Sequence, residues 1–436
     1  MKHIEINSLC HVFTIDDNRS FVIGSPPEWL KSIGDIPFPQ YIFLGKTMIN
    51  HGINYCEVGF PLFKNFFFNN QRKTYVIAPE ENIDRLINIT KDSLQGPDLY
   101  KDEYGWQKAK YFKELHNVYE NYDPSGKLLD FDDFISFSPY ENNTYQLDNI
   151  TITLIDDDSF LVKKDNEEYS ISLYYSPPVI PERKLRNIPG ALSLFCFDSG
   201  DGFSPNKAST SFLLNVKGSY IIFDPNVYAF DIMREKGFDL QKVKALFISH
   251  IHQDHNQGMI KFLQYNKDIS IITGDVVSKS VEVFLNNILD SSASAQYNII
   301  SLPLQKKNEI DFLNITVFCD ISYHSIPTVM TKIYFHDERF KKNVFAYSGD
   351  TIFDPTLVGN KDFNQQYREE LDQFFYDANV IIHEAGAGLF HTDAEDLIPF
   401  MKQYKHLFWV HTPRTEEDPF SRGIILKRGD IVVLKK

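Results

Sequence analysis

Cysteine is scarce in this 436-residue chain, which has only Cys10, Cys56, Cys196 and Cys319. None of the four has CxxC spacing, and together they do not form the pattern of a disulfide framework. We therefore expect buried thiols in a reducing compartment. The sequence also lacks an apolar run of about 18 residues, and its first residues, MKHIEINSLCHVF, lack the apolar core of a signal peptide. These absences predict a cytoplasmic protein with no membrane-spanning helix.

A cluster of Lys and Arg is also missing. The chain has 44 basic and 59 acidic residues, which gives a formal net charge of −15 at pH 7. A protein that grips a long phosphate backbone needs clustered cations to displace its counterions. Long nucleic acid is therefore disfavoured as a partner, although a local cationic site is compatible with this composition.

The length of the chain indicates two domains, because one hydrophobic core rarely serves 436 residues. Residues 176–190, SPPVIPERKLRNIPG, carry four prolines and a cluster of charges, so they are the best candidate for a linker. Residues 1–180 are predicted to form an α+β domain, with helices at 26–34 and 80–94 and successive strands across 151–175. No motif indicates the role of this domain: it could cover an active site, form a homodimer or sense a partner.

Residues 190–436 show a different pattern, in which short apolar runs each end at a polar or ionisable residue. Such runs are typical of strands buried in a layered α/β fold. The strand ends of such a fold share one edge, so residues far apart in the sequence can meet there. The six runs and the residues that end them are SYIIFD at Asp224, KALFISH at His250, ITVFCDISYH at His324, VFAYSGD at Asp350, ANVIIHE at His383 and Glu384, and KHLFWVH at His411.

The segment SHIHQDH at 249–255 places three histidines and an aspartate within seven residues. If the end of the strand stays extended, His250 and His252 point the same way, because alternate residues share a face. Asp254 and His255 follow as the chain turns towards the helix-like NQGMIKFLQY. An imidazole pair followed by an Asp–His pair suits two adjacent metal ions better than one.

An HxHxDH motif after an apolar strand resembles the metallo-β-lactamase superfamily. The other motifs of that superfamily follow in order along the chain: Asp224 in SYIIFDP, His324 in SYHSIPT, Asp350 in YSGDT and His411 in WVHTPR. The resemblance implies that residues 190–436 form an α/β domain of the αββα sandwich type, the metallo-β-lactamase fold, which the α+β domain precedes.

The resemblance also implies a site for two divalent metal ions. Its ligands would be seven side chains: His250, His252 and His324 on the first ion, Asp254, His255 and His411 on the second, and Asp350 between them. Asp224 would orient a ligand histidine or the loop backbone from behind. Nitrogen and oxygen ligands favour Zn²⁺ and tolerate Mn²⁺ or Fe.

Three further segments are similar to the phosphodiesterase branch of the superfamily, which includes the tRNA 3′-processing endonuclease RNase Z and cyclic phosphodiesterases. They are SGDT at 348–351, HEA at 383–385, and HT followed by AED at 391–396. One feature of that branch is missing, because HSIPTVMTKIYF lacks the Gly-Tyr that follows the third motif there. Substrate contacts in that strand are therefore expected to differ.

His391 is predicted to stand just before a helix, because Thr392 and Glu395 have the spacing of a capping box. Unpaired amides at a helix N-terminus attract anions, so His391 could contact a phosphate and protonate the leaving alkoxide, with Glu384 to orient it. The alternative is an ordinary capped helix with an incidental histidine. His383 is either a further catalytic residue or structural support at the rim of the site.

These observations predict a dinuclear-metal hydrolase that cleaves a phosphodiester. Two cations would lower the pKa of a bridging water, and the resulting hydroxide would attack phosphorus in line. Asp254 could accept the proton of the nucleophile, and His391 could serve the leaving group. The negative charge, and the lack of a Gly- and Pro-rich arm in residues 256–323, favour a small substrate such as a cyclic nucleotide or a short oligonucleotide.

Four alternatives stay open. The first is an RNase Z-like endonuclease that processes tRNA 3′ ends. A lactonase or thioesterase would use the same metals on a carbonyl group, although such relatives tend to carry a GHTxG motif that SYHSIPT lacks. A persulfide dioxygenase would keep HxHxDH but use a single iron. A non-catalytic scaffold would have lost ligands, whereas every ligand position is filled in this chain.

Overall fold

The computed structural model of the chain divides into two units. It describes residues 1–69, 71–97, 130–341, 343–352, 369–386, 391–401, 406–414 and 425–435. The described part of the first unit consists of residues 1–69, 71–94, 130–179 and 283–293, and the second unit contains the other described residues, nearly all of them from Ile180 onward. The change from one unit to the other therefore falls within residues 176–190, between the last strand of the first unit and the first strand of the second.

The first unit contains a six-stranded sheet of order β1-β2-β3-β4-β7-β8 and a four-stranded antiparallel sheet of order β12-β11-β10-β9. A separate two-stranded sheet consists of β5 (Ile49–Asn50) and β6 (Ile53–Asn54). The strands of the two larger sheets are β1 (Lys2–Asn7), β2 (Cys10–Asp16), β3 (Arg19–Ile23), β4 (Tyr41–Phe43), β7 (Thr74–Ala78), β8 (Ile135–Pro139), β9 (Thr144–Leu147), β10 (Ile150–Asp156), β11 (Ser159–Lys164) and β12 (Glu167–Ser172).

One of the two helices predicted for this unit is present at full length. The predicted helix at 80–94 is α2 (Glu80–Gln95), whereas residues 26–34 contain only the single 3₁₀ turn η1 (Trp29–Ser32). The prediction for 26–34 was wrong because Glu28 has a φ of 67°, in the left-handed region, which breaks the helical path. The other helices are α1 (Gly59–Phe63), the π-helical η2 (Lys64–Phe68) and α4 (Phe131–Phe134).

The second unit is built on two mixed sheets, one with the order β18-β17-β16-β15-β14-β13-β25 and the other with the order β19-β20-β21-β22-β23-β24. The strands of the first are β13 (Leu192–Asp198), β14 (Ser211–Val216), β15 (Ser219–Phe223), β16 (Val243–Phe247), β17 (Ser270–Gly274), β18 (Ile299–Leu302) and β25 (Ile431–Lys435). Those of the second are β19 (Lys307–Ile310), β20 (Ile315–Ser322), β21 (Thr328–Phe335), β22 (Val344–Tyr347), β23 (Val380–Glu384) and β24 (Leu407–Val410).

Aromatic side chains join the two sheets face to face. Phe212 and Phe223 of the first sheet pack against Phe345 and Tyr347 of the second, with ring centroids 5.0–5.9 Å apart. All four are buried, so they form a water-excluding core between the layers.

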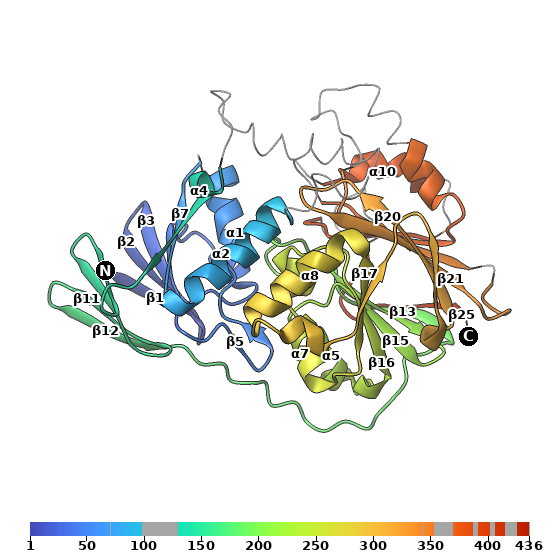
Figure 1. Cartoon of the computed structure of the whole chain (residues 1–436), viewed down its shortest axis with the longest axis horizontal. Coiled ribbons are helices and arrows are strands. Elements are labelled where there is room, and N and C mark those ends of the chain that lie inside the picture. The colour runs from blue at the N-terminus through green and yellow to red at the C-terminus, as the bar shows by residue number, and fades with distance from the viewer. Residues whose placement is uncertain are drawn as a thin grey trace. The chain divides into compact units, whose positions relative to one another are not determined.

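Helices flank the two sheets of this unit (Figure 1). They are α5 (Ala229–Lys236), α6 (Gln253–Asn256), α7 (Met259–Tyr265), α8 (Asp275–Ile288) and α10 (Ala394–Met401), with the 3₁₀ turns η4 (Leu240–Lys242), η5 (Ala293–Gln296) and η6 (Asp311–Leu313). Two packed sheets flanked by helices are the αββα sandwich that the sequence predicts, so the predicted fold class is confirmed. None of the described helices is long and apolar enough to cross a membrane.

Gly258 allows the helix after SHIHQDH to approach the loop after β15. Its backbone N–H donates to the carbonyl of Pro225 over 2.7 Å, and a Cβ at this position would collide with the carbonyl oxygen of Asn226. Because that oxygen belongs to the backbone, it cannot move aside as the end of a flexible side chain could. The loop after β15 carries Asp224, so Gly258 fixes the spacing between two parts of the predicted site.

We predict that Gly258→Ala will lower the free energy of unfolding by about 3 kcal/mol or more, because the added methyl group overpacks a backbone contact. The measurement is chemical denaturation. Gly218→Ala is the control for backbone conformation without a collision, since its φ of 86° is unfavourable for alanine, unlike the −90° of Gly258, but its Cβ would meet nothing closer than Lys242 Nζ at 3.7 Å. That change should cost about 1 kcal/mol. Equal losses in the two variants would contradict this account of Gly258.

Candidate active site

Most of the predicted site residues lie at or just beyond the C-terminal ends of strands, whereas Asp254 and His255 lie in α6 and His391 precedes α10. Strands β15 and β16 are parallel neighbours in the first sheet, and β22, β23 and β24 are parallel neighbours in the second. Strand β20 also runs in this direction, because it is antiparallel to β21, which is antiparallel to β22. Their C-terminal ends therefore meet at one edge of the sandwich. The seven side chains predicted as ligands are all buried there: His250, His252, Asp254, His255, His324, Asp350 and His411.

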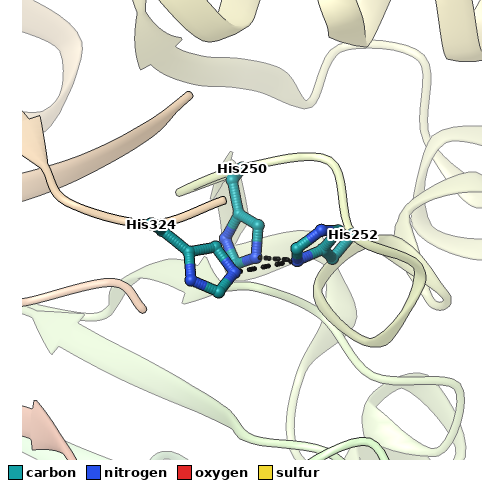
Figure 2. A group of neighbouring side chains, drawn as sticks. All are labelled: His250, His252 and His324. Atoms are coloured by element: carbon teal, nitrogen blue, oxygen red, sulfur yellow. Dashed lines mark hydrogen bonds between the residues drawn. The ribbon is translucent and has the colours of Figure 1, made fainter. Parts of the chain in front are cut away.

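Three of the imidazoles form the first group, His250, His252 and His324 (Figure 2). His252 Nδ1 lies 3.0 Å from Nε2 of His250 and 3.0 Å from Nε2 of His324. Burial and the neighbouring imidazole of His255 hold the pKa of His250 well below its usual value, and burial lowers the pKa of His252 to about 4. Neutral imidazoles with converging nitrogens have the lone pairs that a metal ion requires.

Asp254, His255 and His411 form the second group. Asp254 Oδ2 lies 3.1 Å from His411 Nε2 and 3.5 Å from His255 Nε2. Burial alone would lower the pKa of His255, but the carboxylates of Asp350 and Asp254 raise it well above its usual value. Burial would likewise raise the pKa of Asp254, but the charge of His255 and the hydrogen bond from His411 hold it below its usual range. The carboxylates of this site therefore stabilise positive charge in the second group, whether it is a proton on an imidazole or a bound cation.

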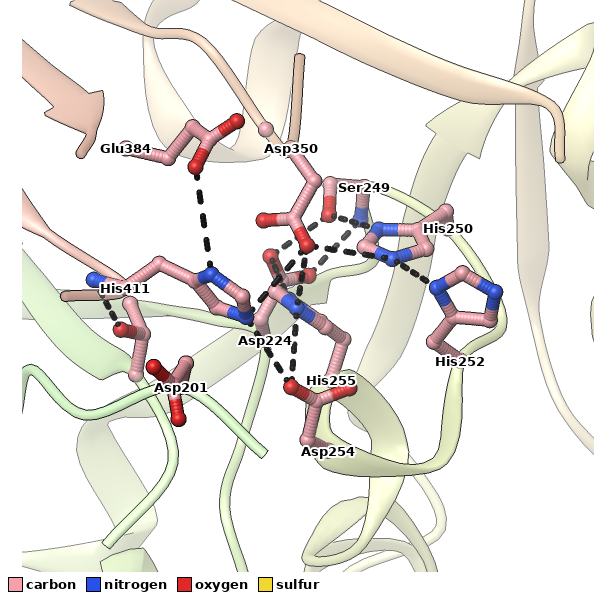
Figure 3. A network of polar contacts seen from close by, with 12 residues as sticks. Asp201, Asp224, Ser249, His250, His252, Asp254, His255, Asp350, Glu384 and His411 are labelled. Carbon is pink, nitrogen blue, oxygen red and sulfur yellow. Dashed lines mark hydrogen bonds and ion pairs between the residues drawn. The ribbon is translucent and has the colours of Figure 1, made fainter. Parts of the chain in front are cut away.

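Asp350 lies between the two groups (Figure 3). Its Oδ2 is 3.3 Å from His255 Nε2 and 3.4 Å from His411 Nε2 on one side, and 3.8 Å from Nε2 of both His250 and His324 on the other. A single carboxylate oxygen thus faces four imidazoles, one pair from each group.

The cluster leaves buried polar atoms without hydrogen bonds. Among the described residues, His255 Nε2 and Asp350 Oδ1 have none, although both residues are almost completely buried. Such atoms are costly unless a further partner satisfies them. The cluster contains only imidazole nitrogens and carboxylate oxygens, in two groups of three with a carboxylate between them. This donor set fits divalent cations such as Zn²⁺.

Asp224 holds the cluster from behind. Its Oδ2 accepts hydrogen bonds from Ser249 Oγ at 2.6 Å and Tyr347 OH at 2.7 Å, and lies 3.0 Å from His255 Nδ1. Its Oδ1 accepts from the backbone N–H of Ser249 at 2.8 Å. Ser249 Oγ in turn lies 3.0 Å from His250 Nδ1. One carboxylate therefore fixes an imidazole in each group, with Nε2 facing Asp350.

Glu384 is fully buried beside the cluster, and both its oxygens accept backbone hydrogen bonds. The donors are Thr351 N at 2.8 Å, Thr392 N at 3.1 Å and Gly386 N at 3.1 Å. Its Oε2 is also 3.2 Å from Nδ1 of His391, which is 3.8 Å from Asp350 Oδ2. Burial alone would lower the pKa of His391, but the charge and hydrogen bond of Glu384 raise it to about 9.

The start of α10 differs from the predicted capping box. The helix begins at Ala394, and the hydroxyl of Thr392 donates to the carbonyl of Thr351 over 2.7 Å. Glu395 pairs instead with Arg414 at 2.6 Å. Thr392 thus ties the segment before the helix to the loop after Asp350, a contact that a local sequence pattern cannot reveal.

His383 lies outside the ligand groups formed by the described residues. Successive residues of β23 point to opposite faces, so His383 and Glu384 diverge. The His383 Nδ1 lies 2.6 Å from the carbonyl oxygen of Glu384, and the ring packs 5.5 Å from that of Phe375.

Four residues of this site were missed by the sequence reasoning: Ser249, Tyr347, Thr210 and Asp201. The hydroxyl of Thr210 accepts from the backbone N–H of His411 at 2.7 Å. Asp201 is drawn with the residues of the cluster in Figure 3, and its charge raises the pKa of His391. Ser249 lies within SHIHQDH and Tyr347 within YSGDT, and their place in these motifs is the only signal that could have indicated them. Thr210 and Asp201 precede every predicted motif, so nothing in the sequence pattern marked them.

Comparisons with known proteins find a matching family and relatives that cover much of this chain. Residues 192–424, a little over half of the chain, match the family described as anti-Pycsar protein Apyc1. The chain is 22% identical over 475 aligned residues to the cAMP/cGMP-dependent 3′,5′-cAMP/cGMP phosphodiesterase B of Dictyostelium discoideum, covering 91% of this chain and 42% of the relative. It is 25% identical over 232 residues to the cGMP-dependent 3′,5′-cGMP phosphodiesterase A of the same organism, covering 51% and 26%. The chain thus spans less than half the length of these relatives.

Among solved structures, the chain is similar to the metallo-β-lactamase fold protein YhfI of Bacillus subtilis. The identity is 15% and the TM-score is 0.42, with 55% of this chain and 99% of that one covered.

We predict that Asp224→Asn will weaken the binding of Zn²⁺ by roughly 10- to 100-fold, because the groups that orient ligand imidazoles strongly influence metal affinity. The measurement is titration of the metal-free protein with Zn²⁺. Asp268→Asn, at an exposed loop position, is the matched control and should bind as the parent protein does. Unchanged affinity in Asp224→Asn, with the unfolding midpoint retained, would show that Asp224 does not orient the ligands.

Proposed function

The chain belongs to the family of the anti-Pycsar protein Apyc1, and we propose that it is a metal-dependent hydrolase that cleaves the phosphodiester of a small nucleotide, with a cyclic nucleotide as the favoured substrate. The observation that carries the proposal is the position of Asp350 Oδ2 between two groups of imidazoles, with His391 3.8 Å away. Two groups that share one carboxylate suit a pair of cations on either side of a phosphoryl group.

The proposed ligands are those of the two groups. His250, His252 and His324 would hold one divalent cation, Asp254, His255 and His411 a second, and Asp350 would contact both. Zn²⁺ is favoured, and Mn²⁺ or Fe would also suit nitrogen and oxygen ligands. Bound cations supply Lewis acidity to a phosphoryl oxygen and lower the pKa of an attacking water.

The chain's own residues have three proposed tasks in this reaction. Asp224 holds His255, and Ser249 holds His250, so that each Nε2 faces Asp350, where the cations would bind. Asp254, whose pKa is held below its usual range, stays ionised, and we assign it to cation binding rather than to proton transfer. This assignment differs from the role as a base that the sequence suggests.

His391 is the proposed general acid. Its Nδ1 faces Glu384, so the proton for the leaving oxygen would be carried on Nε2. With a pKa of about 9, the imidazole is protonated at neutral pH and can donate. Glu384 is then a positioning residue, because its oxygens are used by backbone N–H groups and by His391. His383, which packs against Phe375, is assigned to structural support.

Two observations favour a cyclic nucleotide as the substrate. The net charge of −15 opposes the binding of long nucleic acid. The Dictyostelium relatives are by name phosphodiesterases of 3′,5′-cyclic nucleotides. Because the chain spans less than half of either relative, their substrates carry over only as a proposal.

A substrate panel tests the proposal. Purified protein, with its metals measured, would be assayed on 3′,5′- and 2′,3′-cyclic nucleotides, bis-p-nitrophenyl phosphate, precursor tRNA and a lactone. We expect hydrolysis of the small phosphodiesters. Cleavage of precursor tRNA without cyclic nucleotide hydrolysis would favour the RNase Z alternative, and cleavage of the lactone alone would favour a lactonase or thioesterase. One bound iron with no ester hydrolysis would overturn the hydrolase assignment.

Asp350→Ala should lower kcat/KM for the phosphodiester by roughly 10²- to 10³-fold or more, because it removes the carboxylate that would contact both cations and with it their electrostatic stabilisation of the transition state. The measurement is steady-state hydrolysis together with the unfolding midpoint. Asp268→Ala, at an exposed position, is the control and should retain parental activity. Undiminished hydrolysis in a folded Asp350→Ala protein would contradict the two-cation arrangement.

His391→Ala should lower kcat on a cyclic nucleotide by roughly 10²- to 10⁴-fold, because the alkoxide leaving group needs a proton. The loss should be much smaller on bis-p-nitrophenyl phosphate, whose nitrophenolate leaves without one. Parental kcat on the cyclic nucleotide should fall as the pH rises through about 9, where His391 loses its proton.

The exposed His336→Ala serves as the matched control, and neither kcat nor its pH dependence should change. Equal losses on both substrates in His391→Ala would argue against a general acid and for a role in binding.

A further inference from the structure

The loop that joins β13 to β14 is tied to the cluster by hydrogen bonds. The hydroxyl of Thr210 accepts from the backbone N–H of His411 and donates to the carbonyl of Gly200, over 2.7 and 3.0 Å. The backbone N–H of Thr412 donates to the carbonyl of Ser199 over 3.0 Å. The residue after Gly200 is Asp201, which is drawn with the residues of the cluster in Figure 3 and whose charge raises the pKa of His391. Its position is therefore set by the same contacts that hold a proposed metal ligand.

The two oxygens of Asp201 have different surroundings. Oδ1 accepts from the backbone N–H groups of Phe203 at 2.7 Å and Ser204 at 2.5 Å, which fixes the side chain in a local turn. Oδ2 accepts no hydrogen bond from any residue that the structure describes, and the residue is partly exposed. A rotationally fixed carboxylate thus presents one oxygen to solvent at the side of the site.

A carboxylate at this position needs a donor from the substrate. It repels a nearby phosphate, and its charge also acts on His391. An acceptor so placed strengthens binding only if the substrate offers it an O–H or N–H group. In a nucleotide whose phosphodiester lies at the cluster, the ribose 2′-hydroxyl is the donor closest to phosphorus, whereas the N–H groups of the base lie farther away.

We propose that Asp201 Oδ2 accepts a hydrogen bond from the ribose 2′-hydroxyl of the substrate. The inference rests on the proposed function and narrows it to a 3′,5′-cyclic ribonucleotide. A 2′-deoxy analogue lacks this hydroxyl, and in a 2′,3′-cyclic nucleotide the 2′-oxygen is esterified and has no proton to donate. Asp201 is thus a specificity residue that selects the sugar and the position of the ester.

The test compares kcat/KM for 3′,5′-cyclic AMP and its 2′-deoxy analogue in the metal-loaded protein and in Asp201→Asn. The asparagine can keep Oδ1 as acceptor for the loop, while Nδ2 replaces Oδ2 and cannot accept. We expect the parent protein to prefer the ribonucleotide by roughly 10- to 100-fold, the range of a hydrogen bond to a charged group. In Asp201→Asn this ratio should fall several-fold, because Nδ2 can at most donate to the hydroxyl oxygen and the charge-assisted bond is lost.

Asp198→Asn is the matched control within the same loop. Both oxygens of Asp198 accept backbone N–H groups, from Ser199 at 2.9 Å and Ala208 at 3.1 Å, so this change disturbs the loop and should affect both substrates by the same factor. A parent protein that hydrolyses both cyclic nucleotides equally, or an Asp201→Asn variant that keeps the parental ratio, would overturn the role of Asp201 but leave the proposed function intact. A parent protein that hydrolyses bis-p-nitrophenyl phosphate but neither cyclic nucleotide would overturn both.

Discussion

The carboxylate of Asp350 shares a buried space with four imidazoles, and the arrangement of the site follows from the charge of this group. An ionised carboxylate that leaves water is costly unless positive charge lies beside it. Here that charge can come from protons on His255 and His411, because the carboxylates of Asp350 and Asp254 raise the pKa of both imidazoles. It can also come from divalent cations bound in the same space. Binding of a cation to these imidazoles requires their deprotonation, so occupancy should depend on pH. The cluster is therefore arranged for positive charge rather than for a neutral hydrogen-bonded network.

The two packed sheets bring the residues of this site together and hold them in place. Parallel neighbours within each sheet bring their C-terminal ends to one edge, where residues from Asp224 to His411 meet although 187 positions separate them. The aromatic layer between the sheets excludes water and also reaches the site, because Tyr347 packs against Phe212 and its hydroxyl donates to Asp224. Orientation of the ligands and packing of the core thus depend on some of the same side chains. A change in the core around Tyr347 should therefore alter the orientation of His255.

Apolar runs that end in ionisable residues predict a layered α/β fold with its site at one edge, and HxHxDH predicts a metal site. The sandwich and the full group of residues that the structure gathers were predicted from the resemblance to the metallo-β-lactamase superfamily. The sequence was insufficient for Ser249, Tyr347 and Asp201, which are common residue types whose roles depend on contacts across the fold. Strand alternation would have separated His383 from Glu384 if it had been applied to β23. The helix expected at 26–34 does not form because Glu28 adopts a left-handed backbone conformation, which sequence periodicity does not reveal. The function of the first unit, a homodimer and a cytoplasmic location stay predictions.

We propose that Asp350 lies between two cation sites and would contact a cation in each. Anomalous diffraction from crystals of the zinc-loaded protein, collected on either side of the zinc absorption edge, tests it most directly. We predict two peaks, one among His250, His252 and His324 and the other among Asp254, His255 and His411, with Asp350 in contact with both. A single peak, or peaks remote from Asp350, would contradict the two-cation site.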